Sequence, residues 1–181
     1  MILNERGLTL AEILVAVAII GLGLVGLAVV IPVSSYGLQE GNQLSTATFL
    51  AEQMIERARS AQWTQNPAVD CLGIGTAAAP VPTEIVDSTN TVVSATCNGV
   101  TTTQFPDETT SGVGVSGYSP FTRTVRVTSC ATLSCAGVTG TNSAHMLRRV
   151  GVTVTYTPLT AGGGQAPAPK TVYLEWLVSQ K

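Results

Sequence analysis

A long apolar segment lies near the start of the chain and dominates its hydrophobic pattern. No charged residue occurs from Ile13 to Gln39. A helix needs roughly 20 apolar residues to cross the hydrocarbon core of a bilayer, so this segment is long enough to span one. Because a helix satisfies its own backbone hydrogen bonds in lipid, residues 13 to about 33 are predicted to form a membrane-spanning helix.

From about Leu44 the pattern becomes amphipathic. Apolar residues recur at helical spacing and polar residues fall on the other side, which predicts a helix with one buried face. The apolar positions are Leu44, Ala47, Ala51, Met54, Ile55 and Ala58. Asn66 and Pro67 do not favour continuation, so one long helix over residues 8–62 is predicted to end near Trp63.

Three later segments alternate between apolar and polar residues. Residues 121–128, 149–157 and 171–178 each place apolar side chains on one face, which is typical of an antiparallel sheet covered on one side. A short strand is also predicted within residues 91–97, whereas residues 70–82 are predicted to be a loop. With the amphipathic helix covering a sheet of about four strands, the predicted fold class is α+β.

Composition adds limits on domains and partners. A chain of 181 residues leaves room for one β-rich globular head, residues 63–181, beside the helix. The formal net charge is −2, and the charges in the head are nearly balanced. No broad electrostatic field is therefore expected to attract nucleic acid or anionic lipid.

Four cysteines, all beyond the apolar segment, indicate an oxidising compartment and two disulfides. Three connectivities are open. The favoured one joins Cys130 to Cys135 in a tight loop at a strand end, and Cys71 to Cys97. Their spacing does not match a zinc site, so no metal or cofactor is predicted.

Other candidate chemistry is weak. Two stretches match the Gly-x-Gly-x-x-Gly pattern, at residues 21–26 and 112–117, but neither has the strand, helix and acid that nucleotide binding requires. The single histidine, His145, has no nucleophile or metal-ligand motif beside it. The chain is therefore expected not to be an enzyme.

Four arginines are the only concentrated positive charge: Arg123, Arg126, Arg148 and Arg149. A contact with DNA or an acidic partner is one interpretation, and solvated strand faces are the other. The second is favoured because phosphate binding normally needs a wider basic footprint. Nucleic acid is thus a partner that the sequence allows but does not indicate.

The residues before the apolar segment carry a more specific pattern. The sequence Arg6-Gly7-Leu8-Thr9-Leu10-Ala11-Glu12 resembles the prepilin peptidase site of type IV pilins and pseudopilins. The resemblance implies a leader of residues 1–7, cleavage between Gly7 and Leu8, methylation of the new amine of Leu8, and a role in assembly for Glu12. Two features depart from the family: Leu8 replaces the usual Phe, and the leader is less basic.

Residues 51–60 are also similar to the second helical half of PilV-like minor pilins. This resemblance implies a structural subunit of a Gram-negative type IV pilus that primes assembly or presents the tip, with motility, adhesion or DNA uptake following from the pilus. The implied partners are the prepilin peptidase, other pilins and the inner-membrane assembly platform. The protein would cross the inner membrane once, with a periplasmic head, before entering a surface fibre.

Three alternatives remain open. A minor pseudopilin of a type II secretion system shares the same anchor, although the acid Glu12 argues against the tip pseudopilin. A membrane-anchored periplasmic binding module or hydrolase would keep the segment uncleaved. An ordinary signal anchor could also carry an acid near its start by chance.

Overall fold

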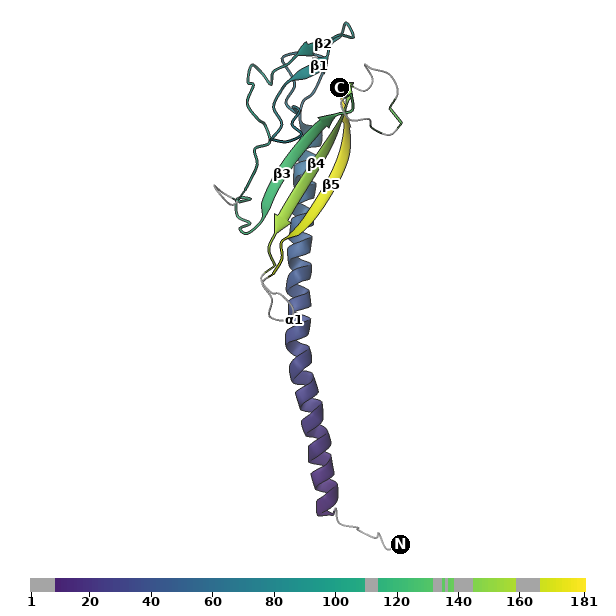
Figure 1. Ribbon diagram of the computed structural model, residues 1–181, viewed down its shortest axis with the longest axis vertical. Helices are drawn as coiled ribbons and strands as arrows, with labels where there is room; N and C mark the ends of the chain where they lie inside the picture. Colours follow the sequence, from purple (N-terminus) through teal and green to yellow (C-terminus); the bar gives the residue numbers. More distant parts are fainter. Residues whose placement is uncertain (1–8, 110–113, 132–134, 136, 139–144, 159–166) are drawn as a thin grey trace, which may run out of the picture. The chain divides into compact units, whose positions relative to one another are not determined.

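The computed structural model describes residues 9–109, 114–131, 135, 137–138, 145–158 and 167–181. This part of the chain contains one helix and five strands, and Figure 1 shows their arrangement. Their bounds are α1, Leu10–Ser60; β1, Glu84–Val86; β2, Val92–Ser94; β3, Thr122–Ser129; β4, Leu147–Tyr156; and β5, Lys170–Ser179. By contacts the chain divides into two compact units, Met1–Gly41 and Asn42–Lys181. The predicted α+β class is confirmed.

Helix α1 agrees with the long helix predicted for residues 8–62. It ends at Ser60, where the Ala61 amide still donates to the Arg57 carbonyl at 3.0 Å. Three residues further, Trp63 forms an antiparallel bridge with Asp70. The chain therefore reverses soon after the helix ends.

The main sheet has the order β3-β4-β5, and both of its strand pairs are antiparallel. Its three strands lie within two residues of the three that the alternating pattern predicts. The fourth predicted strand corresponds to β2, but β2 pairs with β1 in a separate two-stranded sheet. Strand β1 was not predicted, because three residues are too few to display a period of two.

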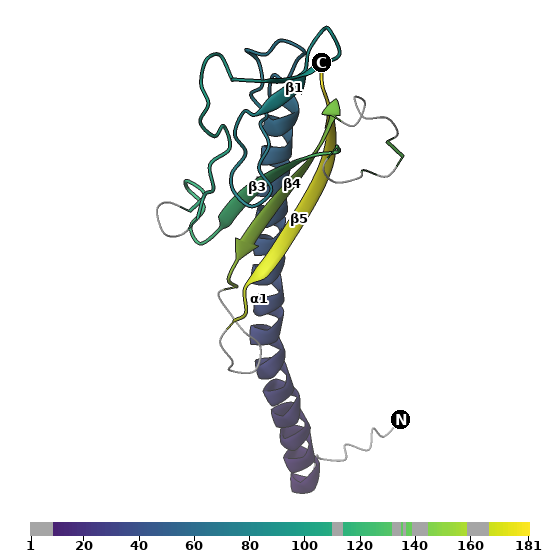
Figure 2. The same ribbon diagram turned by 45° about the horizontal axis from the view of Figure 1, so that its top comes forward.

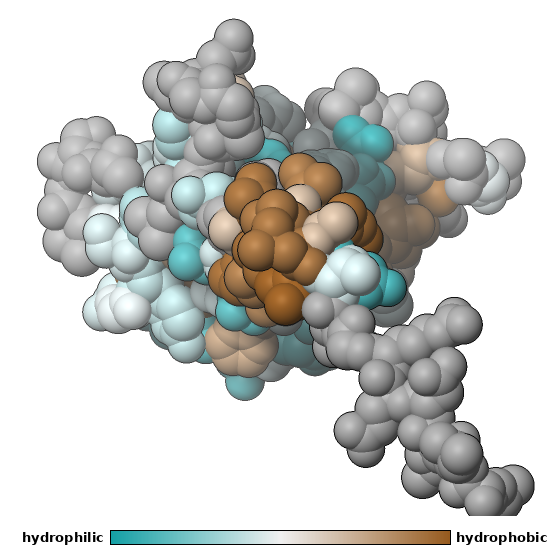
Figure 3. Space-filling view, turned by 90° about the horizontal axis from the view of Figure 1, so that it is seen from below, coloured by the Kyte–Doolittle hydropathy of each residue, from teal (hydrophilic) through white to brown (hydrophobic). Residues whose placement is uncertain are grey.

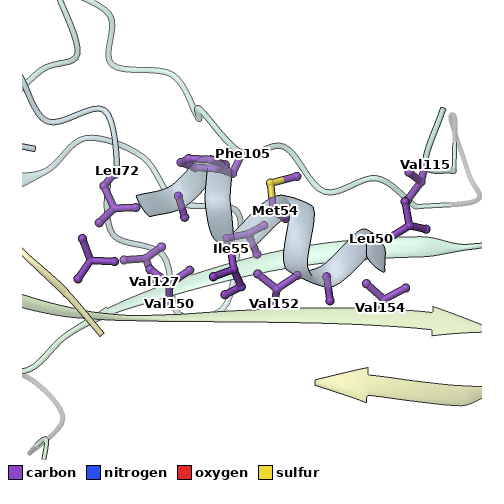
Figure 4. Packing of buried hydrophobic residues seen from close by; sticks show 14 of the residues in the cluster. Leu50, Met54, Ile55, Leu72, Phe105, Val115, Val127, Val150, Val152 and Val154 are labelled. Carbon is purple, nitrogen blue, oxygen red and sulfur yellow. The ribbon is translucent and has the colours of Figure 1, made fainter. Parts of the chain in front are cut away.

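The core of the second unit lies between the C-terminal part of α1 and the main sheet (Figure 4). Ile55 of α1 points toward the sheet, near Val152 of β4, whereas Met54 points to the other side of the helix, on which Phe105 lies. In both Figure 1 and Figure 2 the three strands run beside this part of the helix. The sheet is thus covered on one side, as its alternating pattern predicts.

One position of the predicted helical face is wrong. Leu44 is 50% exposed, whereas Leu50, absent from the predicted stripe, is fully buried. On α1 the buried apolar residues begin at Ala47. Apolar periodicity alone could not show where the sheet stops covering the helix.

Candidate functional site

The start of α1 is closed by a reciprocal pair of side chains. Thr9 directly precedes the helix, and both its amide and its hydroxyl donate to Glu12 Oε2, at 2.9 and 3.0 Å. The Glu12 amide in turn donates to Thr9 Oγ1 at 3.3 Å. This is a capping box, in which two side chains satisfy backbone donors that the first helical turn leaves free.

The capping box also orients the carboxylate. Two donors from Thr9 hold the carboxylate of Glu12 against the N-terminal end of the helix, where the helix dipole favours negative charge. The acid is therefore positioned by the local sequence Thr-x-x-Glu, without help from the second unit. That pattern was readable in the sequence, but its capping role was missed.

The helix that follows exposes apolar side chains in all directions. The large apolar residues from Leu10 to Leu27 are each more than half exposed. Figure 3, viewed from the N-terminal end of α1, shows a group of hydrophobic side chains there. Leu10–Ala28 is the one helical segment among the described residues that is long and apolar enough to cross a membrane. Such a surface requires lipid or other apolar helices around it.

The comparisons with known proteins address this segment. Residues 2–28 match the prokaryotic N-terminal methylation motif. This prepilin-type motif supports a type IV pilin-like protein, either a pilin or a pseudopilin. The motif implies processing by a peptidase and assembly with other pilins. Together with the apolar helix, it fits a membrane-anchored protein. No curated protein and no solved structure matches the chain.

Two of the predicted processing residues, Gly7 and Leu8, lie outside the described residues. Both fall within the matched motif, as does Glu12. Cleavage between Gly7 and Leu8, and methylation of Leu8, stay predictions. Among the predicted residues of this site, the geometry therefore concerns Glu12 alone.

The head contains the two disulfides that the sequence analysis favoured. Cys71 pairs with Cys97, with the Cα atoms 4.7 Å apart, and Cys130 pairs with Cys135, with the Cα atoms 5.2 Å apart. The first closes a long loop after α1, and the second a short loop after β3. The described cysteines include no free thiol.

The arginines correct the sequence interpretation, because two of the four are not on solvated strand faces. Arg148 is 1% exposed and pairs with Asp70, which is fully buried. Its guanidinium also lies 4.2 Å from the centre of the Trp63 ring and donates to the Gly73 and Glu84 carbonyls. Burial lowers the pKa of Arg148, while the hydrogen bond from its guanidinium to Asp70 opposes that change.

Arg123 is also buried, at 4% exposure. It donates to Glu108 at 2.6 Å and to the Leu50 carbonyl at 2.9 Å, so it joins β3 to α1. Arg126 and Arg149 are partly exposed, and Arg126 pairs with Asp107. The basic cluster is thus divided between the two faces of the sheet, which removes the concentrated basic footprint that phosphate binding would need.

A period of two could have revealed the buried arginines. Arg123 lies two residues before Val125, and Arg148 two residues before Val150, so each shares a face with buried valines. A charged residue on an apolar strand face requires a buried partner. The identity of the partners, Asp70 and Glu108, could not be read from the sequence.

The remaining candidate chemistry gains no support as a site. His145 lies 3.7 Å from Glu84 and has no cysteine or second histidine with it in the described residues. The glycine stretch at residues 21–26 lies within α1, and the stretch at 112–117 lies partly outside the described residues. No group of potential metal ligands occurs in the part of the chain that the structure describes.

Proposed function

We propose that this protein is a minor pilin, a structural subunit of a type IV pilus with a role in priming assembly or presenting the tip. It would cross the inner membrane of a Gram-negative bacterium once and hold its head in the periplasm before entering the fibre. In this role it has no catalytic activity. It is a substrate of the prepilin peptidase and a partner of the assembly platform and of other pilins.

The observation that carries the proposal is the position of Glu12 in a prepilin-type motif, at the start of a helix whose apolar side chains are exposed. In a membrane this carboxylate lies near the interface and keeps water. In a fibre core of packed apolar helices, that water would be lost. An uncompensated acid in such a core costs about 2.5–3.5 kcal/mol on insertion scales.

A cation would offset this cost, and the processing reaction creates one nearby. Cleavage after Gly7 would give Leu8 a free amine, four residues before Glu12 along the chain. At 1.5 Å per residue, this is about 6 Å along a helix axis. The capping box uses donors of Thr9 and leaves the carboxylate further acceptor capacity for an amine. We infer that the Glu12 carboxylate pairs with the N-terminal amine of a neighbouring subunit during assembly and accepts a hydrogen bond from it.

The disulfides are consistent with a periplasmic head. Cys71–Cys97 and Cys130–Cys135 need an oxidising compartment. A minor pseudopilin would share this compartment and the anchor, so the second candidate differs only in the fibre that it enters. Recovery of the protein in sheared surface pili, detected by immunoblot, separates the two.

The N-terminal mass of protein extracted from host membranes tests the first step. The expected mature chain begins at Leu8 and carries one additional methyl group. A variant with Gly7→Leu should keep the full precursor, because the peptidase site accommodates a small residue. Wild-type protein that still begins at Met1 would reject the pilin function and favour an uncleaved membrane-anchored module.

A further inference from the structure

Strand β5 leaves one edge of the main sheet open. The sheet order places β5 at one end, and Figures 1 and 2 show it as the outermost strand on that side. At the opposite end, β3 is partly covered, because Val127 bridges to Gly75 and Arg123 bridges to Glu108. Within the described residues, β5 has β4 as its one strand partner.

This edge lacks the features that usually protect an edge strand. Such strands are commonly short, or are interrupted by proline, lysine or a bulge. β5 has ten residues, and its pairing with β4 is continuous over all of them. It contains no proline or glycine, and its charged residues are Lys170 at its first position and Glu175. Its backbone therefore offers a regular row of donors and acceptors to another strand.

Apolar side chains extend beyond the helix at the same edge. Trp176 lies opposite Val150 in the register, so it shares the helix-facing side of the sheet, yet it is 47% exposed. Beside it lies a groove of about 360 Å³, which we call the β5 groove. It is lined by Glu52, Ile55, Glu56 and Arg59 of α1 and by Leu174, Glu175 and Trp176 of β5.

The charges of the groove indicate the chemistry of its occupant. Arg59 is already engaged, because it pairs with Glu56 at 2.6 Å and lies 4.9 Å from the centre of the Trp176 ring. Glu175 is engaged as well, because it pairs with Arg149 at 3.6 Å and accepts a hydrogen bond from the Tyr173 hydroxyl at 2.8 Å. Among the described residues that line the groove, Glu52 is thus the one charged side chain without an ion pair.

We propose that β5 binds an extended segment of a protein partner as an added antiparallel or parallel strand. On its face toward α1 the segment carries apolar and basic side chains in turn at every second residue, with an apolar side chain on Trp176 and a lysine or arginine two residues away beside Glu52. Main-chain hydrogen bonds contribute an affinity that does not depend on the side chains of the segment, and the groove selects among those side chains. A second copy of this chain that pairs through its own β5 fits less well, since residues 171–179 contain no lysine or arginine to lie beside Glu52. The proposal does not depend on entry into a pilus.

A peptide titration of the full chain in a neutral maltoside detergent tests this. The probe is the ten-residue peptide Thr-Val-Thr-Lys-Thr-Val-Thr-Lys-Thr-Val, which carries valine and lysine on one face of a strand. Its binding is followed in the amide NMR spectrum of the labelled protein. The expected result is saturable shifts of amides in β5, with nuclear Overhauser contacts between the two backbones. Shifts that avoid β5 would overturn the proposal.

Matched controls separate strand addition from simpler attraction. The same peptide N-methylated at alternate residues keeps its side chains but loses backbone donors, so it should not bind. Equal binding would overturn strand addition in favour of side-chain docking. A peptide with glutamate in place of lysine should bind at least tenfold more weakly. Equal binding would reject the role of Glu52 in selecting a basic side chain.

Protein variants localise the site. Trp176→Ala and Glu52→Lys should each weaken binding at least tenfold, whereas Tyr118→Ala, at another exposed aromatic residue, should leave it unchanged. Because the N-methylated peptide leaves the protein unaltered, the test stands even where a variant folds poorly. Self-association of the wild-type chain that Trp176→Ala abolishes would assign the edge to a second copy and overturn the proposed partner.

Discussion

Arg148 and Asp70 are 78 residues apart in the sequence, yet their side chains form a two-point ion pair from which solvent is excluded. Nη1 of Arg148 lies 2.5 Å from Oδ1 of Asp70, and Nη2 lies 3.2 Å from Oδ2. The Gly73 amide also donates to Oδ1 at 2.9 Å. Gly73 has φ +70°, and a Cβ there would lie 2.6 Å from the Val81 carbonyl carbon, so the turn requires glycine. This ion pair joins β4 to the loop that follows α1.

Asp70→Asn should destabilise the head strongly, because it leaves the guanidinium of Arg148 buried without a counter-charge. Breaking a buried pair by removing one partner costs about 3–5 kcal/mol. Urea unfolding of the full chain in detergent, followed by tryptophan fluorescence, measures this, since Trp63 contacts Arg148. The matched control is Asp107→Asn, which breaks the partly exposed pair with Arg126 and should cost about 0–1 kcal/mol. Equal losses in the two variants would contradict the expected difference.

The two disulfides should contribute unequally to stability. Their sequence separations are 26 and 5 residues. Chain-entropy arithmetic gives about 3.5 kcal/mol for the first and about 2 kcal/mol for the second. In urea unfolding, the Cys71→Ala, Cys97→Ala double variant should therefore lose more free energy of unfolding than the Cys130→Ala, Cys135→Ala double variant.

Alkylation of exported wild-type protein without reductant should label none of the four cysteines, and labelling of any would contradict the oxidised state.

Thr9→Val should loosen the first turn of α1, because valine keeps the shape of threonine but has no hydroxyl for Glu12. Loss of a helix N-cap costs about 0.5–2 kcal/mol. Hydrogen exchange of the amides near Glu12, measured by NMR in micelles, should become faster. The control is Thr46→Val, since Thr46 bonds to the Asn42 carbonyl within the helix and caps nothing. Unchanged exchange at Glu12 would exclude the capping role.

Glu12→Gln tests the charge separately from the cap. Glutamine at this position still fits a capping box, so the start of the helix should persist while the negative charge is lost. The variant should be cleaved, inserted in the membrane and disulfide-bonded, but depleted from sheared pili relative to the major pilin on immunoblots. Glu40→Gln, an exposed acid later on α1, serves as the control and should enter normally. Normal incorporation of Glu12→Gln would exclude an assembly role for the charge.

Features that depend on neighbours along the chain could be predicted without the fold. The first part of α1 follows from the length of the apolar segment, and its last part from a period of 3.6. Strands β3, β4 and β5 follow from a period of 2 that repeats over eight to ten residues. The start of α1 is equally local, because Thr9 and Glu12 are three residues apart and cap the helix between themselves. This cap lies within one helical turn, so it needs no tertiary contact to form.

The tertiary structure decided the contacts between distant segments. Only the fold brings Asp70 to Arg148 and pairs β2 with β1. It leaves Leu44 exposed, because the buried part of α1 begins at Ala47. It also leaves Trp176 half exposed although its strand position matches that of buried residues. Alternation fixes the face on which a side chain lies, but burial also depends on which element covers that face, and this is set by packing across the whole head.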